Sequence, residues 1–518
     1  MSRSFLTRRT FLVGLGASIA GVAIAACGGG GGGDNGGGQQ AAAPTTAPAA
    51  SNAAQPTPTQ AAAAAAQPTQ APAAAATTAP AAQAGASGGT KGVSGTLNWL
   101  VRTTPQENNG QAQIFEPMIK AKYPDLKINR IIVPSEQYIP KINSMAAANE
   151  SLEIWGFGGN YYDYWWRNLP QDLNQYIAGD KWDVDNYFLP GLPDIYKING
   201  KHFGLPQLTC YGSNLVYNKD LLDAAGLKPP PVDWNDTSWT MDKLLEYAQK
   251  TTKNWGKPDA VYGVSLSLWD RMTSLSYLWG DDSWTPDHYT NFIAQKTNFA
   301  NPGNIAAHQF RQDLIYKYKV HPDPSADQGL NQFANPFKTG KIAMVLDGGW
   351  QYWTTSDITE FKFGFAPVPM AKANKTINFD DFWIMGRWST NKDTAWAVLR
   401  ILTSVEATTK YSELSGTPPT PRESTDPWIK KVAEHTGQSV DDLKKLVSGA
   451  IETKRSQESP DHLFIQHPKI DDTYTNQIAA LWNHSDATAE KVWPQITKAM
   501  DDVVLGIYNQ FKDSRPKD

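Results

Sequence analysis

Apolar and polar positions alternate in blocks from about residue 95 onward, and each block has the period of a strand or of a helix. The predicted strands are 96–101, 126–133 and 154–157, and the predicted helices between them are 111–123 and 137–148. Strand–helix–strand order at this spacing predicts an α/β fold with a parallel sheet that is covered on both faces.

Ligands of such sheets bind at the carboxyl ends of the strands, near the point where the strand order reverses. The loops after Val101, Val133 and Phe157 are therefore the first places to search for a site.

Four more helices are expected later in the chain, at 239–252, 304–319, 391–405 and 489–507. The third has an apolar stripe at i, i+3 spacing, formed by Trp396, Leu399, Leu402 and Val405. Such a stripe is typical of core packing and not of a binding surface.

The N-terminus has the layout of an export signal. Arg3, Arg8 and Arg9 come before an apolar stretch, 11–26, that is shorter than the ~20 residues a membrane-spanning helix needs. Residues 1–10 contain no acid.

Two details of this signal suggest a specific route and an anchor. Residues 7–12, Thr-Arg-Arg-Thr-Phe-Leu, resemble a twin-arginine export signal. Residues 24–27, Ile-Ala-Ala-Cys, resemble a bacterial lipobox, which implies a signal peptide over 1–27 and acylation of Cys27. The alternative is an uncleaved anchor in which the cysteine falls at this point by chance.

Residues 28–94 are dominated by glycine, alanine, proline, threonine and glutamine, with almost no charge. A segment of this composition cannot bury enough apolar area to offset its ordering entropy. We therefore expect a disordered linker that tethers the folded part to a membrane.

The overall composition excludes several classes of protein. The net charge of −4 gives no reason to expect a nucleic-acid partner. Only two cysteines occur, Cys27 within the signal and Cys210, so a disulfide framework is excluded. All 19 tryptophans lie at or after Trp99, which favours a site that contacts large flat apolar faces.

Enzyme motifs are missing from the sequence. There is no His-Glu-x-x-His, no Gly-x-Ser-x-Gly and no phosphate loop that ends in Gly-Lys-Ser or Gly-Lys-Thr. We expect no catalytic residues, no cofactor and no metal. One alternative that stays open is a secreted glycoside hydrolase, because the two catalytic carboxylates of such an enzyme cannot be recognised from sequence. A polysaccharide-binding surface lipoprotein also stays open.

Residues 198–227 resemble the family 1 extracellular solute-binding proteins, the group that includes maltose-binding protein. The segment contains Gly204-Leu205-Pro206 and then Tyr-Asn-Lys-Asp-Leu-Leu over 217–222. Five further matches follow in the family's order, at 239–244, 333–350, 365–369, 391–392 with the helix after it, and 416–422. The chain departs from the family at Leu152-Glu153, where Pro-Asp is usual.

The resemblance implies a two-lobe periplasmic-binding-protein fold, in which two α/β domains are joined by a three-crossing hinge. It places 95–206 and 347–381 in lobe 1, and 207–346 and 382–518 in lobe 2. It implies a monomer that captures a solute, most readily a carbohydrate, by hinge closure. The partner would be the membrane permease of an ABC transporter, reached from a lipid anchor on the outer face of the membrane.

The resemblance also points to ligand-binding residues. Trp350 matches the family's ligand-stacking tryptophan and Asp347 precedes it; a hinge-packing tryptophan and a turn-capping aspartate are the alternatives. Tyr211 follows the first hinge strand and would face the cleft, unless it is a buried tyrosine. Asp381 and Trp383 lie where the third crossing is expected.

Three more candidates come from loops. Phe157 and Asn160 follow the third strand, and the glycines between them permit close approach to a ligand. Trp269 is a candidate from the second lobe. Cys210 is expected to be a small buried residue, because no basic neighbour that could activate a thiol is identifiable.

Overall fold

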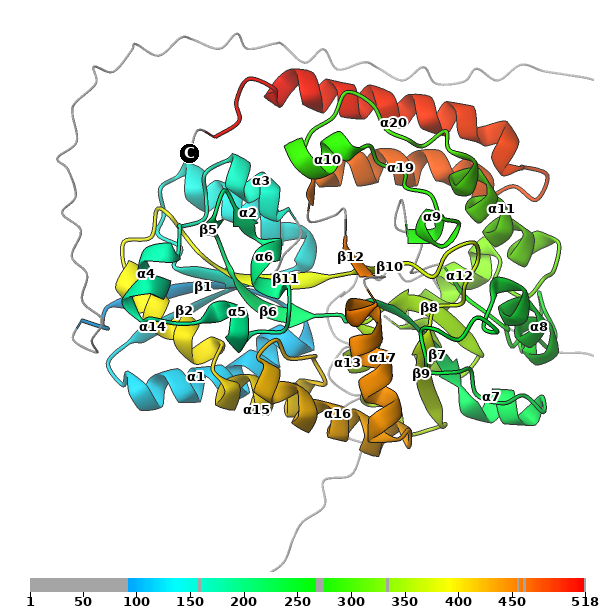
Figure 1. Cartoon of the computed structure of the whole chain (residues 1–518), viewed down its shortest axis with the longest axis horizontal. Coiled ribbons are helices and arrows are strands. Elements are labelled where there is room, and N and C mark those ends of the chain that lie inside the picture. Colours follow the sequence, from blue (N-terminus) through cyan, green and yellow to red (C-terminus); the bar gives the residue numbers. More distant parts are fainter. Residues whose placement is uncertain are drawn as a thin grey trace, which may run out of the picture. The chain divides into compact units, whose positions relative to one another are not determined.

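The computed structural model describes residues 92–156, 160–266, 274–331, 335–453, 456–459 and 463–516 (Figure 1). Phe157, Trp269 and Cys27 lie outside these residues, as does the linker up to residue 91. The described part contains two principal sheets with helices packed around them.

The first sheet has five strands in the order β2–β1–β3–β11–β6. Their bounds are β1 Thr96–Arg102, β2 Lys127–Val133, β3 Ile154–Gly156, β6 Leu205–Thr209 and β11 Asp380–Met385. The strand β1 pairs in parallel with β2 and β3, which confirms the predicted parallel sheet. The late strand β11 runs antiparallel between β3 and β6.

Helices cover both faces of this sheet, as predicted. Alternate residues of β1 point to opposite faces: Trp99 packs with Phe115 of α1 (Gln111–Lys122), whereas Leu100 packs with Tyr138 of α2 (Ser135–Ala147). The α1 face is completed by α14 (Lys392–Leu402) and α15 (Val405–Ser415), and the α2 face by α3 (Tyr161–Trp166) and α6 (Leu192–Ile195).

The second sheet has the order β8–β7–β9, with bounds Met344–Gly348, Ser213–Asn218 and Phe363–Pro367. Both neighbours run antiparallel to β7. Two parallel bridges, Tyr262↔Ile342 and Ser265↔Val345, add residues 262–265 beside β8. The hydrophobic core that packs on this second sheet includes residues of α7 (Lys219–Ala224), α8 (Met241–Thr251), α11 (Pro302–Tyr316) and α17 (Val440–Glu452).

The strand pairing corrects the predicted division of the chain. Residues 347–381 were expected in the first lobe, but β9 pairs with β7 in the second sheet, because β7 accepts an antiparallel partner on each edge. Residues from 382 onward were expected in the second lobe, yet β11, α14 and α15 pack on the first sheet. The chain therefore returns to the first sheet at Asp380 and leaves it again after Ser415.

The remaining elements are short helices, two small ribbons and a C-terminal pair of helices. They are α4 Asn174–Gly179, α5 Val184–Tyr187, α9 Ser274–Leu278, α10 Pro286–Asn291, α12 Pro324–Asn331, α13 Gln351–Thr354, α16 Arg422–Thr436, α19 His467–Trp482, α20 Ala489–Phe511, β4 Lys197–Ile198 with β5 Lys201–His202, and β10 Thr376–Asn378 with β12 Ser456–Glu458. Short π-helical and 3-10 turns occur at Pro105–Gly110 and Pro336–Thr339.

The long predicted helices agree with the structure to within a few residues. The expected stripe on 391–405 is divided between two helices, because Ser404 caps a new helix that begins at Val405. Within the described ranges, no helix combines the length and the apolar character needed to cross a membrane.

Candidate ligand-binding site

Three segments cross between the two sheets, and side chains connect the first two. The first crossing joins β6 to β7 through residues 210–212, and the second joins β10 to β11 through Phe379. The amide oxygen of Asn378 accepts a hydrogen bond from Gly212 N at 2.9 Å, and Thr376 Oγ1 accepts one from Ser213 N at 2.8 Å. The first two crossings therefore lie side by side.

Tyr211 connects the first crossing to the third, which runs through 416–421 between α15 and α16. Its ring stacks on Trp428 of α16, with centroids 5.5 Å apart, and its hydroxyl donates to Pro419 O at 3.2 Å. Only 1 % of Tyr211 is exposed, and its backbone has a φ of 49°. The structure thus shows this predicted ligand residue as a buried tyrosine, which is the alternative that the sequence left open.

Asp347 is the fourth residue of β8, and Trp350 follows the strand by two residues. The indole N–H of Trp350 donates to Asp347 Oδ2 at 2.7 Å, and the amide of Gln351 donates to the same oxygen at 2.5 Å. Asp347 is fully buried, whereas Trp350 is partly exposed. The buried carboxylate therefore fixes the orientation of a partly accessible indole.

Two glycines make room for this arrangement. A Cβ on Gly348 would lie 2.1 Å from Trp350 Cζ3, and a Cβ on Gly349 would lie 1.7 Å from the carbonyl oxygen of Cys210. Side chains at these positions would force the turn away from the first crossing. The pair Gly348-Gly349 thus allows Trp350 to reach the hinge.

Trp350 belongs to a small apolar cluster at the crossings. Its ring meets that of Phe379 edge to face, with centroids 4.9 Å apart. The other members are Leu208, Cys210, Tyr277 and Ile377, with Trp353 at the margin. Cys210 and Phe379 of this cluster belong to the first two crossings, whereas Trp350 follows a strand of the second sheet.

Carboxylates surround the buried thiol in this cluster. Burial raises the pKa of Cys210 well above its usual value, and Asp381, Asp380, Glu458 and Asp347 raise it further. The thiol is therefore neutral, as expected of a buried residue that carries no chemistry. These carboxylates bring negative charge to the crossings.

On the first-sheet side, Asp381 lies near the end of β1. Burial acts to lower the pKa of Arg102, but Glu107 and, more weakly, Asp381 outweigh burial, so the guanidinium stays charged. Arg102 Nε donates to Glu107 Oε1 at 2.6 Å, and Arg102 N donates to Glu107 Oε2 at 3.0 Å. The loop after the first predicted strand thus contributes a partly buried ion pair at the expected edge of the sheet.

Trp383 lies in a different environment from Asp381. Its ring is 5.8 Å from Trp99 and 6.2 Å from Phe115, and 2 % of the residue is exposed. The structure therefore assigns Trp383 to the core between the first sheet and α1.

Asn160 stands at the carboxyl end of β3, where a ligand residue was expected. It precedes α3 in a left-handed conformation, with φ 68°, and is almost fully buried. Its Oδ1 has no hydrogen-bond partner within the described structure.

Arg102, Glu107 and Gln207 were not identified from the sequence. The ion pair of the first two could have been suspected from their separation of five residues after a predicted strand. Gln207 acquires its position from a bulge in β6, for which the sequence carries no signal.

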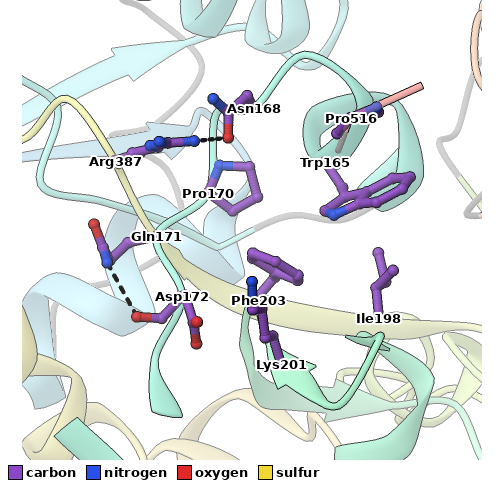
Figure 2. Close-up of a pocket in the computed structure, with 10 residues that line it drawn as sticks. All are labelled: Trp165, Asn168, Pro170, Gln171, Asp172, Ile198, Lys201, Phe203, Arg387 and Pro516. Atoms are coloured by element: carbon purple, nitrogen blue, oxygen red, sulfur yellow. Dashed lines mark hydrogen bonds between the residues drawn. The ribbon is translucent and has the colours of Figure 1, made fainter. Parts of the chain in front are cut away.

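A separate pocket of about 320 Å³ lies at the opposite, amino-terminal edge of the first sheet (Figure 2). Trp165, Pro170, Ile198 and Phe203 form its apolar walls. The polar residues around it are Asn168, Gln171, Asp172, Lys201 and Arg387, with Pro516 from the C-terminal segment. None of the sequence-predicted site residues lines it. Among the described residues, no group of three or more His, Cys, Asp or Glu side chains is arranged to hold a metal ion.

Comparison with solved structures shows the same architecture. An ABC substrate-binding protein from Listeria monocytogenes, solved in complex with cycloalternan, superposes with a TM-score of 0.66 at 20 % identity, covering 79 % of this chain and 98 % of that one. A maltose-bound protein from T. maritima gives 0.61 at 20 % identity, covering 79 % and 99 %. The described part of the chain therefore has the two-lobe periplasmic-binding-protein fold, with one sheet in each lobe.

Sequence comparison identifies the family. A protein from Brucella abortus strain 2308, named as a binding protein, is 25 % identical over 342 residues, which is 62 % of this chain and 76 % of the relative. Residues 113–437 match the family described as bacterial extracellular solute-binding protein, and this stretch is more than half of the chain. The chain belongs to the bacterial extracellular solute-binding protein family.

Proposed function

We propose that the protein captures a carbohydrate, as a mono- or oligosaccharide, between its two lobes and delivers it to the permease of an ABC transporter. The observation that carries this proposal is the partly exposed indole of Trp350, held at the crossings by the buried carboxylate of Asp347. Sugars have apolar ring faces and polar edges, and an aromatic face with carboxylates beside it suits both.

The position of this indole fits a hinge mechanism. Three crossings connect the lobes, so rotation at residues 210–212, 379 and 416–421 opens or closes the space between them. A ligand that contacts both lobes stabilises the closed form by the difference between its affinities for the two forms. The permease would then recognise the closed shape.

The proposed ligand residues are Trp350 and Asp347 from the second-lobe side, and Asp381 and Asn160 from the first. Phe157 and Trp269 remain predictions for the loops outside the described residues. Tyr211 and Trp383 are proposed to act in packing, because their rings are covered by Trp428 and by Trp99 with Phe115.

The carbohydrate class is supported by ligands bound to similar structures. Besides cycloalternan and maltose, maltotriose is bound to a maltodextrin-binding domain from Bdellovibrio bacteriovorus, which has a TM-score of 0.61 at 16 % identity.

A thermal-shift screen tests the proposal. The protein is melted with and without maltose, maltotriose and cycloalternan, and binding to the folded state must raise the midpoint. Chromatography of the sugars after incubation serves as a control for catalysis. A midpoint that no carbohydrate changes would contradict the proposed ligand class, and cleavage products would favour a carbohydrate-active enzyme.

We further propose that the protein is exported and anchored by a lipid on Cys27, with residues 28–94 as its tether. Several acyl chains give stable anchoring, whereas one alone binds only marginally. Expression of Cys27→Ala tests this: the variant should leave the membrane fraction, whereas Cys210→Ala should stay in it. Retention of Cys27→Ala on the membrane would contradict the lipid anchor.

A further inference from the structure

The strand β6 contains one residue more than the strand beside it. Asp381 of β11 pairs with Leu208, but the next residue, Phe382, pairs with Pro206, so Gln207 has no partner in the ladder. A bulge of this kind redirects the side chain of the extra residue and is common beside functional sites. Gln207 lies three residues before the first crossing.

The bulge turns the amide of Gln207 toward the carboxyl end of β3. A Cβ built on Gly156, the last residue of β3, would lie 2.7 Å from Gln207 Oε1 and 2.2 Å from Trp383 Cζ3. The amide oxygen therefore rests against the bare backbone of Gly156, beside the ring of Trp383.

The amide oxygen of Gln207 has no hydrogen-bond partner in the described structure, and only 9 % of the residue is exposed. Asn160 Oδ1, in the segment between β3 and α3, has the same property, with 3 % of the residue exposed. A buried acceptor without a donor destabilises the folded protein, because it has lost its water without a replacement. Such a cost is commonly retained where a ligand supplies the missing donor.

We propose that Gln207 is a ligand-binding residue, whose amide oxygen accepts a hydrogen bond from a hydroxyl of the bound saccharide. This inference rests on the proposed function and adds a residue of the first hinge strand to its site. Asn160, which precedes α3, supplies a second unpaired acceptor, so the first lobe recognises hydroxyl donors. Trp350 contributes the apolar contact from the other lobe.

The proposal predicts effects of opposite sign on stability and on binding. Gln207→Met removes the acceptor and keeps the length of the side chain. The unliganded midpoint of this variant should rise by about 2 °C or more, because an unpaired polar group is lost. Its affinity for maltotriose or cycloalternan should fall by about 10-fold or more, because a ligand hydroxyl loses its acceptor.

Gln113→Met is the matched control, since Gln113 lies exposed on α1 and has no part in the site. Its midpoint and its saccharide affinity should both equal those of the wild type. Melting curves give the stabilities, and titration calorimetry with maltotriose and cycloalternan gives the affinities.

Each other result overturns the inference in a recognisable way. A midpoint of Gln207→Met at or below that of the wild type, which needs no ligand to measure, would show that the oxygen is already satisfied, for example by a buried water. A raised midpoint with unchanged saccharide affinity would show an unpaired oxygen that no ligand contacts. Failure of the wild type to bind either saccharide would contradict the proposed function itself, and the role of Gln207 with it.

Discussion

The ring of Phe292 lies against that of Tyr162, with centroids 3.9 Å apart. Tyr162 belongs to α3 on the first sheet, whereas Phe292 follows α10 and shares a core with α19 and α20. The helix α20 packs in turn on α11 of the second lobe. The two rings therefore connect the lobes at a place far along the chain from the crossings.

The C-terminal segment strengthens this connection. Trp166 Nε1 donates to Ser514 Oγ at 3.0 Å, and the guanidinium of Arg515 lies 5.8 Å from the ring of Trp165 and 5.7 Å from that of Phe292. Asp163 Oδ1 also accepts from Gln466 N at 3.1 Å. If the lobes rotate about the crossings, these contacts restrain that rotation.

Phe292→Ala should change the balance between the open and closed forms of the unliganded protein. Loss of the ring removes an apolar contact that restrains the lobes, so the radius of gyration in small-angle scattering and the affinity for saccharide should both change. Ser514→Ala, which loses only one hydrogen bond, should show a smaller change in the same direction. An unchanged radius of gyration for Phe292→Ala would show that these contacts do not restrain the lobes.

Trp350→Ala should abolish the largest saccharide-induced thermal shift while changing the unliganded midpoint by only a few degrees. The indole is partly exposed, and Gln351 still donates to Asp347 when it is removed. Trp350→Phe keeps an aromatic face but loses the N–H that orients it, so an intermediate shift is expected. If both variants respond to saccharide like the wild type, Trp350 is not a ligand residue.

Tyr211 tests the difference between packing and ligand contact. Tyr211→Phe loses the hydrogen bond to Pro419 O, at a cost of about 1 kcal/mol in the free energy of unfolding. Tyr211→Ala also loses the stack on Trp428, at a cost of about 3–5 kcal/mol. Urea titrations measure both. Tyr211→Phe should bind saccharide as tightly as the wild type. A large loss of affinity would instead show that Tyr211 contacts the ligand.

His288 should make the protein less stable in mild acid. Burial lowers its pKa from 6.5 in the unfolded chain to about 3 in the folded protein, where its ring packs on Trp284 and Phe464. The unfolded state therefore binds more protons between these values. The contribution of His288 to the free energy of unfolding is therefore complete above pH 6.5. It is lost as the pH falls toward 3, at about 1.4 kcal/mol per pH unit.

The measurement is a pair of urea titrations at pH 7 and pH 4.5 on the wild type and on His288→Phe, which keeps an aromatic ring. The difference in stability between the two pH values should be smaller for the variant. An equal difference would mean that His288 does not change its protonation between the folded and unfolded states.

The sequence was sufficient to predict most of the local structure. The strands β1, β2 and β3 and the helices α1, α2, α8, α11 and α20 begin and end within a few residues of their predicted positions. Alternation of period two and apolar spacing of period 3.6 are local patterns, and neighbouring residues alone express them. The need for Gly348 is also local, because a Cβ there would meet the ring of Trp350 two residues later.

The sequence did not predict which sheet receives the later strands. Apolar strands such as β9 and β11 are acceptable in either sheet, and the choice depends on edges formed by residues more than a hundred positions earlier. The predicted division failed here, since it placed β9 with the first lobe and the segment after residue 381 with the second.

The side-chain environments at the crossings could likewise not be predicted from the sequence, because they depend on the tertiary structure. The sequence by itself determined the class of fold and the family, since each depends on short contiguous patterns. The tertiary structure decided that Tyr211 packs on Trp428, that Trp383 lies in the core and that the bulge at Gln207 leaves an amide oxygen unpaired. Each of these depends on the register between distant segments, and a shift of one residue in a strand exchanges the face on which every side chain lies.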